Sequence, residues 1–412
     1  MMRLTAEEEA MLAGEQGAAV RQAMEIVVAL GNIYHAADLV PIAHAQVAGV
    51  SYKNLGDAGL AFLQEWADNG ARVRVPTTLN PAGIDTAQWQ ALGIPADFAR
   101  KQAEVIAAYT AMGIRHTLTC APYQVGYSPT PGEHIAWSES SAVSFANSIL
   151  GARTNREGGP GALAAAIVGR TARYGLHLDE GRRADHQVIV TCELRHEADF
   201  GALGYLIGKR LGNAIPLFRF QGKTPDLTLG GDGQGELLLR ALGAAMAASG
   251  AVALYHVAGI TPEASAMNML LPDAPMIVIS SLQEAYAALN SAAEPIDFVS
   301  IGCPHATLAE IAEVARLVRG EMLRARLWVT TSRQTREEAA QRGWVQAIEA
   351  AGGFVVADTC VVVAPVELLG ARSMATNSAK AAFYAPSHGG MSVHLGPLAQ
   401  CIHAAIAGRW EA

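Results

Sequence analysis

The sequence is poor in charged and aromatic residues, and it contains no long hydrophobic run. Charged residues make up 17% and aromatic residues 6% of the 412 residues, whereas 51% are hydrophobic. A chain with this balance buries a large core, so intrinsic disorder is excluded. Glycine, serine and histidine interrupt the apolar stretches before they reach the roughly 20 residues that a membrane-spanning helix needs. We therefore expect no membrane span.

Positive charge and cysteine are also scarce. The formal net charge is −8 and no long run of lysine or arginine occurs, which argues against a nucleic-acid or anionic-membrane partner. Near the N-terminus stand Glu7, Glu8 and Glu9, where a signal peptide would carry positive charge. The five cysteines are an odd number and widely scattered. We expect reduced thiols or metal ligands in a cytoplasmic protein, and no disulfide framework.

Glycine and alanine are abundant, and predicted strands alternate with predicted helices. The 41 glycines and the many alanines are typical of helices packed closely on parallel sheets. The alternation is clearest in the last third of the chain. There the pattern predicts strands at residues 297–301, 326–331 and 353–357, and helices at 307–318 and 337–351. This order predicts an α/β fold with parallel sheets.

We expect the chain to divide near a proline-containing stretch at residues 271–276. Residues 1–275 would form an α/β region of two intertwined subdomains. Residues 276–412 would form a C-terminal βαβ domain.

Three cysteines, Cys120, Cys303 and Cys360, each end a predicted strand. In open α/β sheets, ligands bind beyond the carboxyl ends of the strands. Three thiolates that meet in one cleft would form a soft donor set, suited to iron or an iron–sulfur cluster with one coordination position left for a substrate.

A second interpretation of these cysteines stays open on the residues alone. Free cysteine is among the most buried residue types, and a strand-end cysteine is commonly a small core residue. We assign Cys192 and Cys401 to packing. His305, two residues after Cys303, is either a ligand, a donor to a ligand, or an ordinary residue at a helix start.

Several longer motifs resemble the aconitase X family. The likeness extends over essentially the whole chain, and the block of 25 residues at 132–156 is too long to arise by chance. The motifs that carry it are VAGVSYKNLGDAG (47–59), TLNPAGID (78–85), TCAPY (119–123), GEHIAWSESSAVSFANSILGARTNR (132–156) and NSAKAAFY (377–384).

The resemblance implies an aconitase-like fold, in which several parallel-sheet α/β domains surround a central cleft. It also implies a lyase that dehydrates small hydroxy acids. Three cysteines in this family hold iron, as an iron–sulfur cluster or as mononuclear iron, and the matching positions are Cys120, Cys303 and Cys360. A small swivelling domain or subunit completes the family's site. We recognise no such domain in these 412 residues and expect a separate small subunit that supplies the catalytic base.

A glycine turn and a neighbouring loop are candidates for substrate binding. Gly49, Val50 and Ser51 follow a predicted strand, and their N–H groups and hydroxyl could hold a carboxylate or phosphate. An ordinary turn with a capping serine is the alternative. The resemblance favours the binding site, with Asn80 and Pro81 on a neighbouring loop.

The other candidates are a carboxylate, a hydroxyl, an amide and two cations. Glu139 and Ser140 suit dehydration chemically, although serine-rich helix starts are commonly caps. Asn155 and Arg156 precede a glycine-rich helix entrance, which is a natural anion pocket. Lys380 has apolar neighbours, so we expect it to hold a substrate carboxylate, although most lysines are solvated surface charges. The predicted catalytic residues are Ser51, Glu139, Ser140 and Lys380.

On this resemblance, we interpret the chain as the large subunit of an iron-dependent hydro-lyase. The expected substrate is cis-3-hydroxy-L-proline, which yields Δ1-pyrroline-2-carboxylate, and the alternative substrate is 5-phosphomevalonate. An alternative of another class is a non-catalytic binding or partner subunit. In the enzyme, iron would act as a Lewis acid on the departing hydroxyl. Lys380, Ser51 and the loop of Asn155 and Arg156 would hold the substrate carboxylate.

Overall fold

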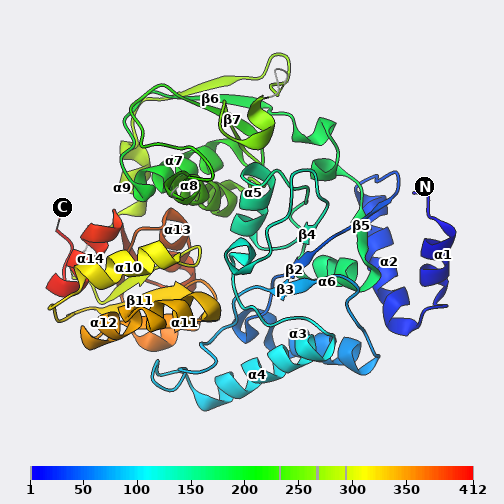
Figure 1. Cartoon of the computed structure of the whole chain (residues 1–412), viewed down its shortest axis with the longest axis horizontal. Helices are drawn as coiled ribbons and strands as arrows, with labels where there is room; N and C mark the ends of the chain where they lie inside the picture. The colour runs from blue at the N-terminus through cyan, green and yellow to red at the C-terminus, as the bar shows by residue number, and fades with distance from the viewer. Residues whose placement is uncertain (1, 232, 266–268, 293–294, 412) are drawn as a thin grey trace.

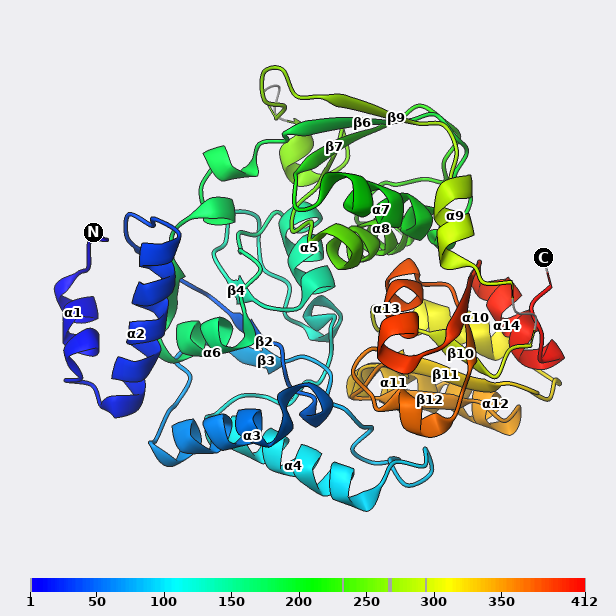
Figure 2. The same ribbon diagram turned by 180° about the vertical axis from the view of Figure 1, so that it is seen from behind.

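Three parallel sheets and their helices organise the chain (Figures 1 and 2). The computed structural model describes residues 2–231, 233–265, 269–292 and 295–411. In both views helix α5 (Ser140–Ser148) lies near the centre, where the three groups of elements meet. The predicted α/β fold with several parallel-sheet domains is confirmed.

The N-terminal group carries a three-stranded parallel sheet and a two-stranded antiparallel one. Its further elements are α1 (Ala6–Ala13), α2 (Ala18–Ile33), β1 (Leu39–Pro41), β2 (Ala45–Val47), α3 (Tyr52–Asp68), β3 (Thr77–Leu79), α4 (Ala96–Ala111), β4 (Ala136–Trp137), α6 (Gly159–Val168) and β5 (Arg170–Ala172). The parallel strands lie in the order β3, β2, β4, while β1 pairs with β5. β4 is followed directly by α5, so the chain passes from this sheet to the centre of the molecule.

The middle group carries a four-stranded parallel sheet in the order β8, β7, β6, β9. Its elements are β6 (His186–Val190), α7 (Glu197–Leu211), β7 (Pro216–Phe220), α8 (Gln234–Gly250), β8 (His256–Val257), β9 (Met276–Ile279) and α9 (Gln283–Leu289). Helices α7 and α8 pack very closely. A Cβ atom on Gly204 would lie 2.3 Å from the carbonyl oxygen of Leu242, so only glycine permits this approach.

The C-terminal group carries a five-stranded, wholly parallel sheet in the order β12, β11, β10, β13, β14. Its elements are β10 (Phe298–Ile301), α10 (Leu308–Leu317), β11 (Arg326–Thr331), α11 (Arg333–Gln341), α12 (Trp344–Ala350), β12 (Phe354–Ala357), β13 (Ser373–Thr376), α13 (Ala379–Gly389), β14 (Ser392–Leu395) and α14 (Leu398–Ala407). The three predicted strands are present. The helix predicted at 337–351 is two helices, because Gly343 has a φ of +78°.

The predicted division between residues 275 and 276 stays a prediction. Strand β9 comes directly after it and pairs in parallel with β6 of the middle sheet. None of the helices in the described ranges is both long and apolar enough to cross a membrane. The cytoplasmic location likewise stays a prediction.

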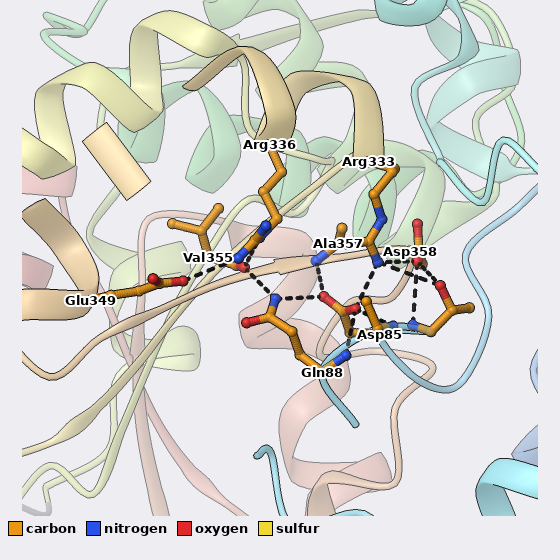
Figure 3. A network of polar contacts seen from close by, with 10 residues as sticks. Asp85, Gln88, Arg333, Arg336, Glu349, Val355, Ala357 and Asp358 are labelled. Carbon is orange, nitrogen blue, oxygen red and sulfur yellow. Dashed lines mark hydrogen bonds and ion pairs between the residues drawn. The ribbon is translucent and has the colours of Figure 1, made fainter. Parts of the chain in front are cut away.

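A buried polar network joins the N-terminal group to the C-terminal sheet (Figure 3). Asp85, in the loop after β3, is fully buried. Its carboxylate accepts hydrogen bonds from the N–H of Ala357 (2.8 Å) and from the guanidinium of Arg333 (2.7 Å). Arg333 also pairs with Asp358, which follows β12 and accepts a hydrogen bond from the hydroxyl of Thr86 (2.6 Å). The network therefore fixes the loop after β3 against the end of β12.

The protonation of Asp85 follows from these contacts. Burial would raise the pKa of this carboxyl, but the hydrogen bonds from Arg333 and from the N–H of Ala357 lower it below its ordinary value. A group whose pKa is lower in the folded chain stabilises the fold at neutral pH. That contribution is lost as the pH falls through the folded pKa.

We predict that Asp85→Asn lowers the free energy of unfolding at pH 7 by about 2–4 kcal/mol, because Arg333 loses one of two buried partners. The exposed pair of Glu338 and Arg342 provides the control, and Glu338→Gln should change stability by less than about 1 kcal/mol. Urea unfolding from pH 7 down to pH 3 measures both. The difference in free energy of unfolding between the wild type and Asp85→Asn should shrink as the pH falls toward 3. A difference that grows as the pH falls would contradict a charged, stabilising Asp85.

Candidate active site

The three candidate cysteines lie on loops at the carboxyl edge of the strands. Cys303 follows β10 and Cys360 follows β12, as predicted. The strand predicted before Cys120, at residues 116–119, is wrong. The φ of Leu118 is +47°, which interrupts an extended chain, although the N–H of Thr119 still donates to the carbonyl of Leu79 at the end of β3 (3.0 Å). Cys120 therefore reaches this edge on a loop.

The three thiols share one buried region with a lysine. Burial raises the pKa of each thiol, to about 12 at Cys303, and the ammonium of Lys380 opposes the rise in all three cases. The thiols of Cys120 and Cys303 both interact with that of Cys360.

The two cysteines assigned to packing lie elsewhere. Cys401 is buried in α14 within the core of the C-terminal group, and its thiol donates to the carbonyl of Gly396 (3.5 Å). Cys192 lies just beyond β6 and packs against the core that contains α7 and α8. Their placement agrees with a packing role for both residues.

The chemistry of the donor set fits iron. Three soft sulfur donors come from three loops, and a buried cation lies close enough to oppose the rise that burial causes in the pKa of each thiol. Within the described ranges, no three histidine, cysteine, aspartate or glutamate side chains stand close enough to hold an ion as they are now oriented. The thiols would have to turn toward a common point to hold one.

A buried ion pair stands beside the thiols. Glu139 is the N-cap residue of α5 and Lys380 lies in the first turn of α13, and both are 7% exposed. The Nζ of Lys380 lies 2.5 Å from Oε1 of Glu139, and it also donates to the hydroxyl of Ser140 (3.3 Å). The other carboxylate oxygen accepts from the hydroxyl of Ser141 (2.6 Å) and the N–H of Ala142 (2.7 Å). The structure thus brings together three of the four predicted catalytic residues.

Both members of the pair are charged. Burial would raise the pKa of Glu139, but the Lys380 ammonium and the hydrogen bonds to the carboxylate lower it to about 2. Burial would lower the pKa of Lys380, but the Glu139 carboxylate and the thiols of Cys303 and Cys120 raise it above its ordinary value. Lys380 is therefore neither a surface charge nor an unpaired cation.

His305 lies fully buried among the three cysteine loops. Its Nδ1 is 3.0 Å from the hydroxyl of Thr119, and its Nε2 is 3.0 Å from the carbonyl oxygen of Thr359. Its main-chain N–H donates to Sγ of Cys120 (3.2 Å). Burial lowers the pKa of the imidazole to about 4. The ring is neutral and both nitrogens are engaged, so His305 contacts the ligand loops and is not free to bind a metal.

The glycine turn lies against the C-terminal group. Gly49 has a φ of +81°, and Ser51 is buried at the start of α3. The hydroxyl of Ser51 donates to the carbonyl of Val363 (2.8 Å), three residues after Cys360, and does not cap its own helix. The carbonyl of Val50 accepts from the amide of Gln102 (2.9 Å). The turn is therefore beside the Cys360 loop.

The neighbouring loop offers a polar atom without a partner. Oδ1 of Asn80 is buried and has no hydrogen-bond partner among the residues that the structure describes. Pro81 follows it and is buried, and the N–H of Ala82 donates to the carbonyl of Asp358 (2.8 Å). The loop of Asn80 and Pro81 thus also reaches the chain that leads to Cys360.

Asn155 and Arg156 have different surroundings. The side chain of Asn155 is buried, accepts from the N–H of Leu176 (2.9 Å) and donates to the carbonyl of Tyr174 (3.1 Å). These contacts hold the chain at residues 174–176, so the side chain of Asn155 has a structural role. Arg156 is exposed and forms a parallel bridge with Trp137, two residues before Glu139. The guanidinium of Arg156 donates to the carbonyl of Ala247 in α8 (3.3 Å), so neither of these two predicted residues is without a partner.

Arg240, a buried cation of α8, is a further residue beside the cysteine loops that no predicted motif contained. Its guanidinium pairs with Glu310 (2.7 Å) and donates to the carbonyl of His305 (3.1 Å). It also lines a cleft of about 320 Å³ together with Tyr123 and Gln124, which follow Cys120. A single arginine in the apolar sequence LLLRALGAAMAA could have indicated this residue. A buried arginine needs a carboxylate or carbonyl partner.

Comparison with known families gives three matches along the chain. The model described as "Aconitase X first domain" matches residues 1–180, "Aconitase X second domain" matches residues 184–286 and "Aconitase X third domain" matches residues 296–407. A crystal structure titled as aconitase X of Thermococcus kodakaraensis in its holo-form has a TM-score of 0.89 and 48% sequence identity. It covers 98% of this chain and 100% of the solved one.

Two kinds of named relatives are similar over most of the chain. The phosphomevalonate dehydratase large subunit of Methanothermobacter thermautotrophicus is 50% identical over 385 residues, which are 93% of this chain and 94% of the relative. The cis-3-hydroxy-L-proline dehydratase of Pseudomonas aeruginosa is 39% identical over 421 residues, which are 99% of this chain and 70% of the relative.

We predict that Lys380→Met lowers the free energy of unfolding by about 3–5 kcal/mol, because it leaves Glu139 buried without its cation. The double variant Lys380→Met/Glu139→Gln should recover a large part of this loss, since no charge then remains unpaired. Urea unfolding of the two single variants and the double variant measures the coupling. Additive losses would show that the pair is not formed.

Proposed function

The chain belongs to the aconitase X family, and we propose that it is the large subunit of a dehydratase that acts on 5-phosphomevalonate. The named relatives in this family are dehydratases, so the non-catalytic alternative is set aside. Four relatives named phosphomevalonate dehydratase large subunit are 47–50% identical to this chain and a fifth is 37% identical. Two relatives named cis-3-hydroxy-L-proline dehydratase are 39% and 33% identical. The relatives thus favour 5-phosphomevalonate, the alternative substrate, over cis-3-hydroxy-L-proline.

The two substrates differ in charge. 5-Phosphomevalonate carries a carboxylate at one end and a phosphate at the other, while cis-3-hydroxy-L-proline carries one carboxylate and an ammonium. A site for the first therefore needs positive potential in two places. Lys380 provides one cation beside the cysteines, and we assign the substrate carboxylate to it, in exchange for one of its hydrogen bonds to the hydroxyls of Ser140 and Ser141.

The entrance to α6 is our candidate for the phosphate. The N-cap Gly158 has no side-chain oxygen, so the first N–H groups of this ten-residue helix keep no capping partner from it. A Cβ on Gly159 would lie 2.5 Å from the carbonyl oxygen of Ala48, so the helix start is pressed against the chain just before the glycine turn. The exposed Arg156 lies three residues before Gly159. Its guanidinium donates to the carbonyl of Ala247 in α8 (3.3 Å), a contact that it would exchange for the phosphate. The juxtaposition of a helix start, a glycine turn and an exposed arginine supports the proposal.

Dehydration removes a proton from the carbon next to the carboxylate and a hydroxide from the following carbon. Glu139 is a poor base for this proton, because its pKa is lowered to about 2. Its role is to keep Lys380 charged and oriented. Asn80 supplies an unpartnered acceptor in the same region, which suits the proton of the substrate hydroxyl. When bound by Cys120, Cys303 and Cys360, iron would supply Lewis-acid assistance to the departing hydroxide.

We assign the catalytic base to a separate small subunit. Relatives named large subunit match over 94% and 98% of their own length, whereas the Pseudomonas aeruginosa dehydratase matches over 70% of its length. The name "large subunit" of the first kind of relative supports a second subunit. The low pKa of Glu139 supports it independently, because the chain's own buried carboxylate at the site does not serve as the base.

We predict that the anaerobically prepared chain, combined with its small subunit, dehydrates 5-phosphomevalonate in preference to cis-3-hydroxy-L-proline. Arg156→Gln should raise KM for 5-phosphomevalonate about ten- to a hundredfold, which corresponds to a charge-assisted hydrogen bond of about 1.5–3 kcal/mol. Steady-state kinetics on both substrates measures these effects.

Arg219→Gln is the matched control, because Arg219 is an exposed arginine on β7 of the middle sheet. It should leave KM unchanged. Turnover of cis-3-hydroxy-L-proline without turnover of 5-phosphomevalonate would overturn the substrate assignment. An unchanged KM in Arg156→Gln would overturn the phosphate site alone.

A further inference from the structure

The imidazole of His305 connects segments that are far apart in the sequence. Thr119 immediately precedes Cys120 and Thr359 immediately precedes Cys360, while His305 itself comes two residues after Cys303. The two ring contacts, both of 3.0 Å, therefore reach the residue next to each of the other two cysteines. The main-chain N–H of His305 adds a direct contact to Sγ of Cys120.

The partners fix which nitrogen carries the proton. The carbonyl oxygen of Thr359 only accepts hydrogen bonds, so Nε2 of His305 is the donor in that contact. In a neutral ring Nδ1 is then the acceptor, and the hydroxyl of Thr119 donates to it. The same hydroxyl accepts from the N–H of Ala121 (3.1 Å). The result is a directed chain of hydrogen bonds from the Cys120 loop through His305 to the Cys360 loop.

The loop of His305 is itself held from outside. Its carbonyl accepts from Arg240 (3.1 Å), and the carbonyl of Ala306 accepts from the hydroxyl of Thr331 in β11 (2.7 Å). The imidazole is thus a short, rigid ring that joins the two loops, and its own main chain is held in place by these contacts. A flexible or apolar side chain in its place leaves the carbonyl of Thr359 without this donor and the hydroxyl of Thr119 without this acceptor.

We infer that His305 is a positioning residue, which sets the relative positions of Cys120, Cys303 and Cys360 so that their thiols meet at one metal. The inference rests on the part of the proposed function that assigns iron to these cysteines. Residues that orient metal ligands through hydrogen bonds typically contribute ten- to a hundredfold to metal affinity.

The test is a titration of the full-length, metal-free chain with Co²⁺ under anaerobic conditions, because thiolate-bound Co²⁺ absorbs visible light. His305→Leu should weaken the dissociation constant for Co²⁺ about ten- to a hundredfold. Thr119→Val removes only the hydroxyl donor, and it should weaken binding in the same direction. The double variant should bind no more weakly than His305→Leu, since both changes break one chain of hydrogen bonds. His305→Gln restores a donor and an acceptor, so it should recover part of the affinity.

His256 supplies the matched control. It is another buried histidine, and its Nε2 lies 2.8 Å from the carbonyl oxygen of Arg182 in the middle group. His256→Leu should lower the unfolding temperature but leave Co²⁺ affinity unchanged. If His256→Leu loses as much Co²⁺ affinity as His305→Leu, the loss comes from general destabilisation of the fold. That result would overturn the inference.

The remaining outcomes separate the inference from the proposed function. Wild-type affinity for Co²⁺ in both His305→Leu and Thr119→Val would overturn the positioning role while leaving the metal assignment intact. A wild-type chain that binds no Co²⁺ through thiolates would overturn both. If His305→Leu does not fold, Thr119→Val decides, because it removes one hydroxyl and preserves the shape of the side chain.

Discussion

The buried pair of Lys380 and Glu139 is the interaction on which the rest of the site depends. An ammonium and a carboxylate that are each 7% exposed carry a desolvation cost of several kcal/mol apiece, and this cost is met only when they contact one another and further donors or acceptors. Glu139 receives its remaining hydrogen bonds from the first turn of α5. The pair therefore requires the start of α5 and the start of α13 to lie together, and these starts are 241 residues apart in sequence.

Other contacts between the N-terminal and C-terminal groups surround this pair. Asp85 with Arg333 fixes the loop after β3, Ser51 bonds to the chain after Cys360, and His305 reaches back to Thr119. Each contact buries a polar group whose partner comes from a distant segment, so each is satisfied only in the assembled fold. The carboxyl ends of the strands in the two groups thereby face one another. Their loops bring the three cysteines, a cation and Oδ1 of Asn80, which has no partner among the described residues, to one buried region.

The alternation of buried strands and helices made the C-terminal sheet predictable, and with it the places of Cys303 and Cys360 at strand ends. Local backbone conformation was less visible in the sequence. A positive φ at Leu118 replaces the strand expected before Cys120 with a loop. The partner of Lys380 was not predictable, because a contact between residues 241 positions apart depends on how whole groups of elements pack. The same holds for His305, whose ring contacts lie 186 and 54 residues away.

The proposed chemistry depends on iron held jointly by Cys120, Cys303 and Cys360. X-ray absorption at the iron edge, on anaerobically prepared full-length protein combined with its small subunit, tests it most directly. We expect sulfur atoms bound directly to iron. The number contributed by the protein should fall when any one of the three cysteines is replaced by serine. We expect no change when Cys192 or Cys401 is replaced in the same way. Iron bound only to oxygen and nitrogen, or iron whose bound atoms do not change in the three cysteine variants, would show that these cysteines do not hold it.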